Sequence, residues 1–144
     1  TDEHISLMEA LHAYGPVAVL VTTPQAVALA DNVRSLDFAH KVGLPVVGLI
    51  ENLSGYVCPH CAECTNVWGR GGGESLAAQR GLPFLGRVPI DPALVRLLDD
   101  AREEAEQQDS PDALTYATIR RYRTSATFVY FQPIAEAVRQ YTRA

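Results

Sequence analysis

Apolar residues in the first ninety positions form short runs separated by helix-like segments. Continuous runs rich in β-branched residues occur at 16–22 (PVAVLVT), 44–51 (LPVVGLIE) and 82–88 (LPFLGRV). Such runs are typical of strands buried on both faces of a parallel sheet. The segments between them predict helices over about 24–42 and 74–80. This order predicts β–α–β units, in which right-handed crossovers join parallel strands.

Proline, glycine and small polar residues mark the predicted ends of these elements. Thr23 and Asp91 each precede a proline, which predicts an N-cap followed by proline at the first helical position. Gly43 and Gly81 are predicted to stop the two helices. An opening helix is predicted over residues 2–14, where apolar residues recur at helical spacing.

The remainder of the chain is predicted to be helical. A helix starting after Asp91 continues to about Gln107, and a polar break (QQDSPD) follows it. Two further helices are predicted up to residue 144, the second started or interrupted near Pro133. The fold class predicted is therefore α/β: the second half of a doubly wound, mainly parallel sheet with a helical C-terminal tail.

Two predicted loops lie at the edge of the sheet where ligands bind in such folds. Asn52 and the cysteine-containing stretch follow the second predicted strand, and Pro89, Ile90 and Asp91 follow the third. Because ligands of open α/β sheets sit beyond the carboxyl ends of the strands, both loops are candidates for a binding site. Asn52 also has a simpler interpretation, as a residue that ends a strand by capping its loop.

Composition and charge exclude several classes of function. A chain of 144 residues that is 47% hydrophobic fits a single domain with a core of its own. The net charge of −5 argues against nucleic-acid binding, for which a basic face is expected. No apolar run is long enough to span a membrane and no signal peptide opens the chain, so we expect a cytoplasmic protein without membrane contact.

All three cysteines lie within seven residues, in the run Cys58-Pro-His-Cys-Ala-Glu-Cys64. This clustering points to metal or redox chemistry in a reducing compartment rather than to a secreted disulfide framework. Zinc and iron–sulfur sites usually need four ligands, which three cysteines do not supply. We therefore expect a second copy to complete the site across a two-fold axis, with two cysteines contributed by each subunit.

Other interpretations of the cysteine run remain open at this point. Cys58 and Cys61 could hold structural zinc across a dimer. Cys-Pro-His-Cys is also a redox motif of thioredoxin-like proteins, but the residues after Cys61 are poor helix formers and the motif lies late in the β–α series. Cys64 is either a spare ligand or a small buried residue, and His60 is expected to be exposed in the loop.

A phosphate-binding P-loop is absent from the sequence as given. No G-x-x-x-x-G-K-[ST] motif occurs, and the single lysine, Lys41, belongs to the last turn of a predicted helix. The glycine run 71–73 could present backbone N–H groups to an anion, or it could be a flexible connector. We expect this chain alone not to hydrolyse ATP, because a P-loop lysine and hydroxyl are missing.

Four segments taken in order resemble one family. They are 22–31 (TTPQAVALAD), 43–61 (GLPVVGLIENLSGYVCPHC), 71–77 (GGGESLA) and 82–92 (LPFLGRVPIDP). This set is similar to the Mrp-type, nucleotide-binding-protein family of iron–sulfur scaffold P-loop ATPases, relatives of MinD. The Cys58–Cys64 run, with TDEHIS at the start, most resembles the smaller of the two eukaryotic cytosolic scaffold subunits. The resemblance covers about residues 1–98.

The resemblance implies a fold, a cofactor and site residues. It implies that residues 1–98 are the C-terminal part of a P-loop ATPase domain, starting after the P-loop, and that residues 99–144 are a helical extension. It implies a [4Fe-4S] cluster bridged between subunits by Cys58 and Cys61. It also implies that Asn52 faces the adenine of ATP, with Pro89, Ile90 and Asp91 closing the other side of the base pocket.

The expected function follows from this resemblance. It is a cytosolic iron–sulfur assembly scaffold that holds a labile cluster and passes it to apo-proteins, gated by ATP and Mg²⁺ in the full-length protein. The expected partners are a second copy or a larger paralogous scaffold subunit, with apo-proteins and targeting factors downstream. The alternative is a zinc-bridged α/β interaction domain without a transfer role.

Overall fold

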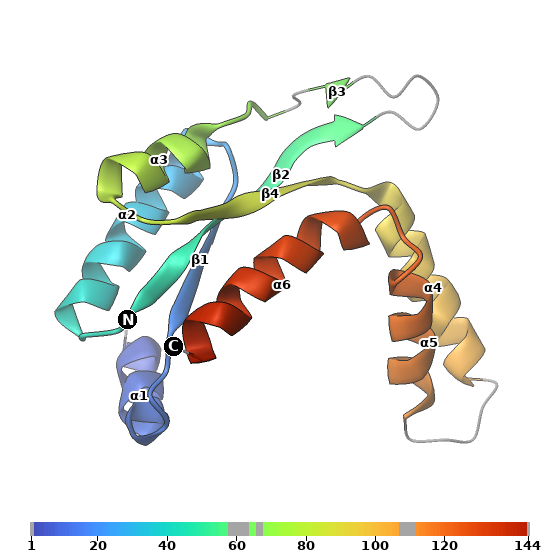
Figure 1. The fold of residues 1–144 in the computed structure, drawn as a ribbon, viewed down its shortest axis with the longest axis horizontal. Helices are drawn as coiled ribbons and strands as arrows, with labels where there is room; N and C mark the ends of the chain where they lie inside the picture. Colours follow the sequence, from blue (N-terminus) through green and yellow to red (C-terminus); the bar gives the residue numbers. More distant parts are fainter. Residues whose placement is uncertain (1, 58–63, 66–67, 107–111, 144) are drawn as a thin grey trace.

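A computed structural model describes residues 2–57, 64–65, 68–106 and 112–143. Helices and strands alternate through the first two-thirds of the chain, and helices alone follow (Figure 1). The elements are α1 (Asp2–Leu11), the short 3₁₀ helix η1 (His12–Tyr14), β1 (Ala18–Thr22), α2 (Ala26–Lys41), β2 (Val46–Val57), β3 (Cys64–Thr65), α3 (Gly72–Arg80), β4 (Phe84–Ile90), α4 (Pro92–Glu106), α5 (Ala113–Tyr122) and α6 (Phe128–Arg143).

The sheet is built around β2. This strand pairs in parallel with β1 and with β4, and its last two residues pair antiparallel with β3. Each parallel pair is joined through a helix, as two parallel neighbours require. Among the described residues β1 pairs only with β2. A groove of 560 Å³ lies beside β1, between α1 and α2. The predicted fold class is confirmed.

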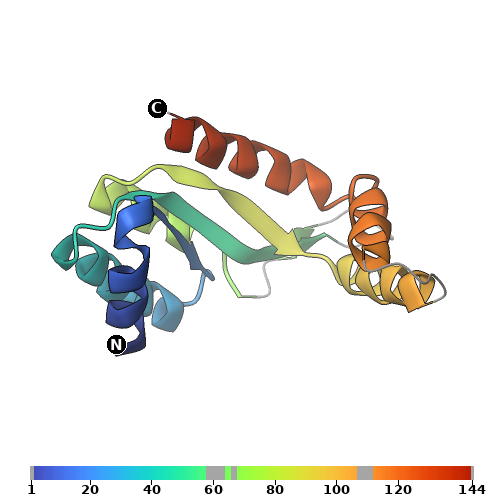
Figure 2. The ribbon, with the colours of Figure 1, turned by 90° about the horizontal axis from the view of Figure 1, so that it is seen from below.

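Helices cover the two faces of the sheet. α2 and α3 lie on one face and α6 lies on the other, as the turned view shows (Figure 2). Ile134 of α6 packs on Ile50 of β2 and Val88 of β4, with Val19 and Leu85 around them. Because strands buried on both faces must be apolar throughout, this arrangement explains the continuous apolar runs in the sequence.

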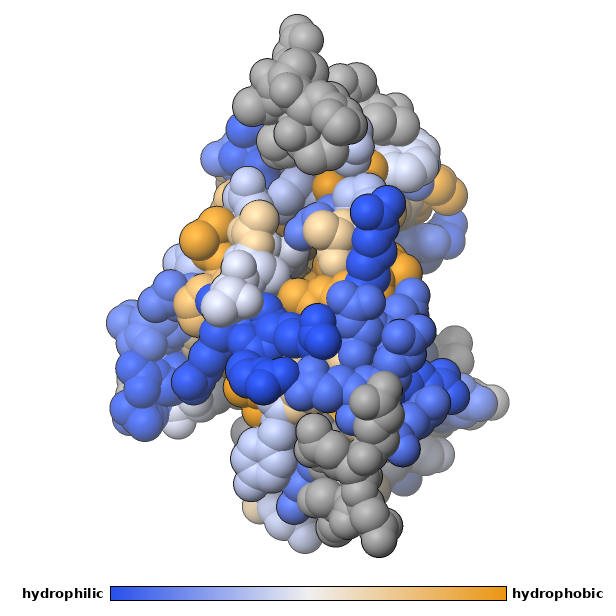
Figure 3. Space-filling view, turned by 90° about the vertical axis from the view of Figure 1, so that its right-hand side faces the viewer, coloured by the Kyte–Doolittle hydropathy of each residue, from blue (hydrophilic) through white to orange (hydrophobic). Residues whose placement is uncertain are grey.

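Helices α4 and α5 form an antiparallel arm that projects away from the sheet (Figure 1). Ion pairs join Glu104 of α4 to Arg120 and Arg121 of α5, at 2.5 and 3.1 Å. Seen from the side on which the arm projects, the described surface is largely hydrophilic (Figure 3). No helix of the described residues is both long and apolar enough to cross a membrane.

Several predicted boundaries hold and others are wrong. Gly43 and Gly81 follow their helices with positive φ angles of 68° and 65°, as predicted. Thr23 does not cap α2: the helix begins two residues later than predicted, with Gln25 as its N-cap and no side-chain cap. Pro133 lies inside α6 and neither starts nor interrupts it. It lies early in the helix, where its missing N–H costs a single backbone bond.

The second and third strands are longer than their apolar runs. β2 continues to Val57 and β4 to Ile90, so Asn52, Pro89 and Ile90 lie inside strands rather than after them. The division of the chain at residues 98 and 99 falls within α4, which is continuous from Pro92 to Glu106. That division stays a prediction.

Candidate functional site

The predicted base-binding residues lie on two neighbouring strands. Asn52 of β2 is the register partner of Val88 of β4, the residue before Pro89. Adjacent strands of a sheet lie about 4.8 Å apart, so the structure brings Asn52 and the Pro89–Asp91 segment together. Their predicted contact with adenine remains a prediction.

A bulge in β2 follows Asn52. The register advances from Asn52–Val88 to Tyr56–Ile90, so residues 53–55 face Pro89 alone. Proline has no N–H to donate to a ladder, which gives a reason for the break at this point. The backbone turns sharply there, because Leu53 has a φ of +54° and Gly55 a φ of +85°. Asn52 Oδ1 accepts a hydrogen bond of 2.9 Å from the Leu53 N–H, which supports that turn.

Asp91 has a structural task in addition to its predicted one. Its Oδ1 accepts a 2.9 Å hydrogen bond from the Ala93 N–H, which caps α4 as the sequence predicts. Its Oδ2 accepts a hydrogen bond from the hydroxyl of Thr127, a side chain that is only 1% exposed. Both carboxylate oxygens are therefore used within the chain, so Asp91 is held in place at the edge of the predicted pocket.

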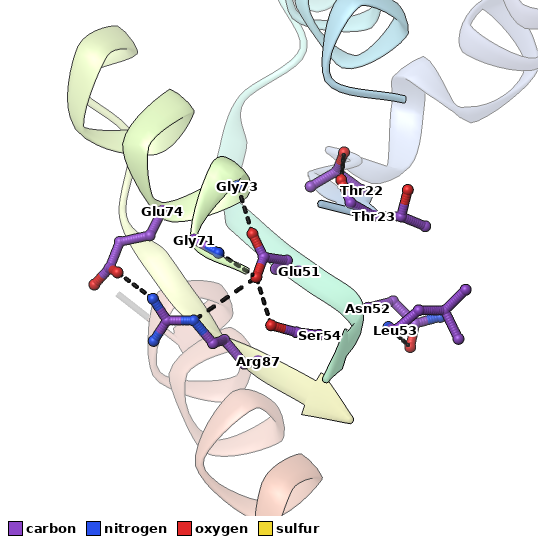
Figure 4. A network of polar contacts seen from close by, with 10 residues as sticks. All are labelled: Thr22, Thr23, Glu51, Asn52, Leu53, Ser54, Gly71, Gly73, Glu74 and Arg87. Carbon is purple, nitrogen blue, oxygen red and sulfur yellow. Dashed lines mark hydrogen bonds and ion pairs between the residues drawn. The ribbon is translucent and has the colours of Figure 1, made fainter. Parts of the chain in front are cut away.

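Behind Asn52, the preceding residue Glu51 has a fully buried side chain. Its carboxylate accepts hydrogen bonds from the N–H groups of Gly71 at 3.0 Å and Gly73 at 2.6 Å. The Ser54 hydroxyl donates a third, at 2.5 Å, and Arg87 Nε lies 3.7 Å from Oε1. Figure 4 shows these groups converging on Glu51, while Asn52 points away from them. We call Glu51, Ser54, Gly71, Gly73 and Arg87 the Glu51 network.

The Glu51 network favours the ionised carboxylate. Burial by itself opposes ionisation, but the hydrogen bonds from Ser54, Gly71 and Gly73, together with the charge of Arg87, outweigh it and hold the pKa of Glu51 below its ordinary value. The N-terminus of α3 adds to this, because helix N-termini favour a negative charge. Arg87 also pairs with the exposed Glu74 and lies 5.1 Å from the centre of the Phe84 ring.

The network resolves the open question about the glycine run. The N–H groups at the start of α3 do bind an anion, but that anion is the chain's own Glu51. Glycine is required on two grounds: Gly71 has a φ of +86°, and a Cβ on Gly73 would lie 3.1 Å from the Glu51 carboxylate. A connector without fixed contacts is therefore the wrong interpretation.

Sequence reasoning missed the Glu51 network, although a signal was present. Glu51 and Arg87 are charged residues within or at the end of apolar strand runs, and they are register partners on neighbouring strands. Buried charges are normally paired, so opposite charges in two adjacent buried strands indicate an internal ion pair.

The predicted metal ligands Cys58 and Cys61 lie outside the described residues, as does His60. The described chain leaves β2 at Val57 and returns at Cys64, and these two residues are register partners. No group of three or more possible metal ligands occurs among the described residues. We call residues 57–64 the cysteine segment.

Two solved structures resemble this fold. The nucleotide-binding protein of Archaeoglobus fulgidus in complex with ADP matches with a TM-score of 0.55 and 30% identity, over 74% of this chain and 43% of that one. The cell division ATPase MinD of Pyrococcus furiosus matches with a TM-score of 0.51 and 21% identity, over 85% of this chain and 42% of that one. The second likeness shows the fold alone.

Curated relatives share much more sequence. The cytosolic Fe-S cluster assembly factor CFD1 of Mycosarcoma maydis is 48% identical over 182 residues, which cover 96% of this chain and 50% of that protein. NUBP2 of Bos taurus, named a cytosolic Fe-S cluster assembly factor, is 52% identical over 120 residues, covering 83% of this chain and 44% of the relative. The chain spans about half the length of these relatives.

A family model described as NUBPL iron-transfer P-loop NTPase, of the ParA type, matches residues 1–122. The match extends beyond the segments that carried the resemblance in the sequence and agrees with the fold. The resemblance is thereby confirmed: the chain belongs to the ParA-type family of NUBPL iron-transfer P-loop NTPases.

Proposed function

We propose that this chain is part of a cytosolic scaffold that holds a labile [4Fe-4S] cluster between two subunits and passes it to apo-proteins. Membership of an iron-transfer family supports the proposal, as do relatives named cytosolic Fe-S cluster assembly factors. The cluster is the cargo of the scaffold. In this chain, Cys58 and Cys61 would be the cluster ligands.

The observation that carries the proposal is the position of the cysteine segment. Its ends, Val57 and Cys64, are paired at the carboxyl end of the central strand, the edge at which ligands of such sheets bind. Two thiolates from each of two chains would give the four sulfur ligands that a [4Fe-4S] cluster requires. A partner chain would be a second copy or a larger paralogous scaffold subunit, and apo-proteins and targeting factors would act downstream.

The neighbouring Asn52 supports a nucleotide-dependent scaffold. We propose that Asn52, with Pro89, Ile90 and Asp91, contacts the adenine of ATP, and that ATP with Mg²⁺ gates the cluster in a protein that also contains a P-loop. The 144 residues hold no P-loop motif, and Lys41 lies in the last turn of α2, where it complements the helix dipole. Residues 1–98 would then be part of the ATPase domain, a P-loop segment would pack on the open edge of β1, and residues 99–144 would extend the domain.

Anaerobic iron and sulfide analysis, combined with the mass in solution, tests the proposal. We expect equal iron and sulfide, broad visible absorption, and a dimer whose cluster is lost in Cys58→Ala and in Cys61→Ala. Cys64→Ala is the matched control from the same segment and tells whether this third thiol is a ligand. A cluster-bound monomer would contradict the bridge, and stoichiometric zinc without iron would favour the alternative, a zinc-bridged interaction domain.

A further inference from the structure

We propose that Glu51 is a positioning residue that ties β2, which leads into the cysteine segment, to the start of α3, which follows it. This inference rests on the proposed function in one respect: it takes the cysteine segment to carry the cluster. It assigns a role to a buried carboxylate that neither the base pocket nor the cysteines use.

The chain connectivity gives the first step. Glu51 lies in β2 before the cysteine segment, and Gly71 and Gly73 lie after it, at the start of α3. The carboxylate therefore joins the strand that leads into the segment to the helix that follows it, through hydrogen bonds of 3.0 and 2.6 Å. The β2–β3 and β2–β4 ladders also join the two sides of the segment, but these two bonds are the hydrogen bonds described from β2 to the start of α3.

The start of α3 depends on this carboxylate. Its N-cap is Gly71, which has no side chain to accept a hydrogen bond from the first N–H groups of the helix. A helix usually satisfies those groups with an N-cap serine, threonine or aspartate. Here a residue twenty positions earlier does so, and its hydrogen bond ties the start of α3 to β2.

The same carboxylate also holds the bulge next to Asn52. Ser54 lies in that bulge, and its hydroxyl donates to Glu51 Oε1, the atom that also accepts from Gly71. Removing the negative charge would therefore loosen the bulge and the start of α3 together. Arg87 Nε, which is buried and makes no hydrogen bond among the described residues, would lose the carboxylate that lies 3.7 Å from it, while Glu74 would still pair with the same guanidinium.

Hydrogen–deuterium exchange on the cluster-free intact protein tests the positioning role directly. In Glu51→Gln we expect roughly tenfold faster exchange at Gly71 and Gly73 and in the β2–β3 ladder, with Leu49 and Ala18 unchanged. Glu74→Gln is the matched control, because Glu74 also pairs with Arg87 but is 55% exposed. Leu36→Ala, a buried change in α2, controls for general loss of stability.

Cluster retention is the second readout. We expect Glu51→Gln to accept a reconstituted cluster and to release it to a chelator roughly tenfold faster, the lower end of the effect of residues that orient metal ligands. Glu74→Gln and Leu36→Ala should release it at the rate of the unaltered protein.

The two readouts separate the possible failures. If Glu51→Gln raises exchange over the whole sheet as Leu36→Ala does, or leaves Gly71 and Gly73 unchanged, the positioning role is overturned. If the unaltered protein binds no iron, the scaffold function fails, and the exchange pattern alone decides whether Glu51 positions the segment.

Discussion

The Glu51 network and the α4–α5 arm use the same chemical groups in different surroundings. Glu51 is fully buried, and its carboxylate accepts hydrogen bonds from backbone N–H groups at the start of α3. Glu104 of the arm has a side chain that is 21% exposed, and its partners are the guanidinium groups of Arg120 and Arg121, which are 69% and 36% exposed. Both carboxylates have several donors, so a count of contacts would treat them as equal.

Burial makes the two sets differ in what they do. Water can replace the arginine partners of Glu104, and salt screens them, so the arm gains little from each pair. No water can replace the donors of Glu51, and their loss would leave buried polar groups without partners. The buried set therefore determines the arrangement of the chain around the site, whereas the exposed set holds two helices together weakly.

Removing each carboxylate gives the largest expected contrast. Glu51→Ala should lower the free energy of unfolding by about 3–5 kcal/mol, because the donors of Gly71, Gly73 and Ser54 lose their buried acceptor, at about 1–3 kcal/mol each. Glu104→Ala should cost about 1 kcal/mol or less, as exposed pairs do. Urea unfolding of the two variants measures both values, and equal losses would show that burial does not distinguish the two sets.

A pair of glycine substitutions separates backbone strain from the network. Gly71 and Gly43 have φ angles of +86° and +68°, and a Cβ on Gly43 would meet nothing within 4 Å. Gly43→Ala should cost about 1 kcal/mol through its left-handed backbone alone. Gly71→Ala should cost about 2–3 kcal/mol, because its N–H would also shift away from Glu51. Thermal unfolding at neutral pH compares them; a Gly71→Ala that costs no more than its control would argue against the bond to Glu51.

Acid should weaken the buried set through Glu51 itself. The pKa of Glu51 lies below the ordinary 4.5 in the folded protein, so its charge stabilises the fold above about pH 4.5, and this contribution is lost as the pH falls through the lowered value. The stability difference between the unaltered protein and Glu51→Gln should therefore be constant from pH 7 to 5.5 and shrink below pH 4.5. Unfolding curves at each pH test the sign, and a gap that widens in acid would contradict it.

Salt should produce the smallest effect, and only in the arm. Raising the ionic strength from about 0.1 to 1 M shortens the screening length from roughly 10 to 3 Å. The small cost of Glu104→Gln should disappear at the higher value, while the cost of Glu51→Gln should persist. Urea unfolding of the two variants at both salt concentrations measures these costs. Equal salt sensitivity of the two costs would mean that water reaches Glu51.

The regular elements were predictable because their signals are local. Apolar runs fixed the three parallel strands, and glycines after α2 and α3 marked the helix ends correctly. The strand ends were not predictable in this way, because β2 and β4 continue past their apolar runs through the bulge opposite Pro89. That continuation depends on pairing between distant segments. Gly55 and Pro89 were the available signs of a bulge.

The candidate site was predictable in its position and not in its internal bonding. The proximity of Asn52 to the Pro89–Asp91 segment follows from the topology of parallel strands. The Glu51 carboxylate reaches the start of α3 because Glu51 is buried deeply and because Gly71 and Gly73 have no side chains in the way. Those are properties of the packed structure, which a single sequence shows only as an unexplained charge in an apolar run.

The position of α6 has a consequence for how the protein is made. Synthesis proceeds from the N-terminus, so β1, β2 and β4 emerge from the ribosome before Ile134, the residue that covers Ile50 and Val88. Until then one face of the sheet is exposed to chaperones and proteases. A premature stop or frameshift before Ile134 would therefore leave the fold uncovered and favour its degradation, even though every residue of the candidate site would already be present.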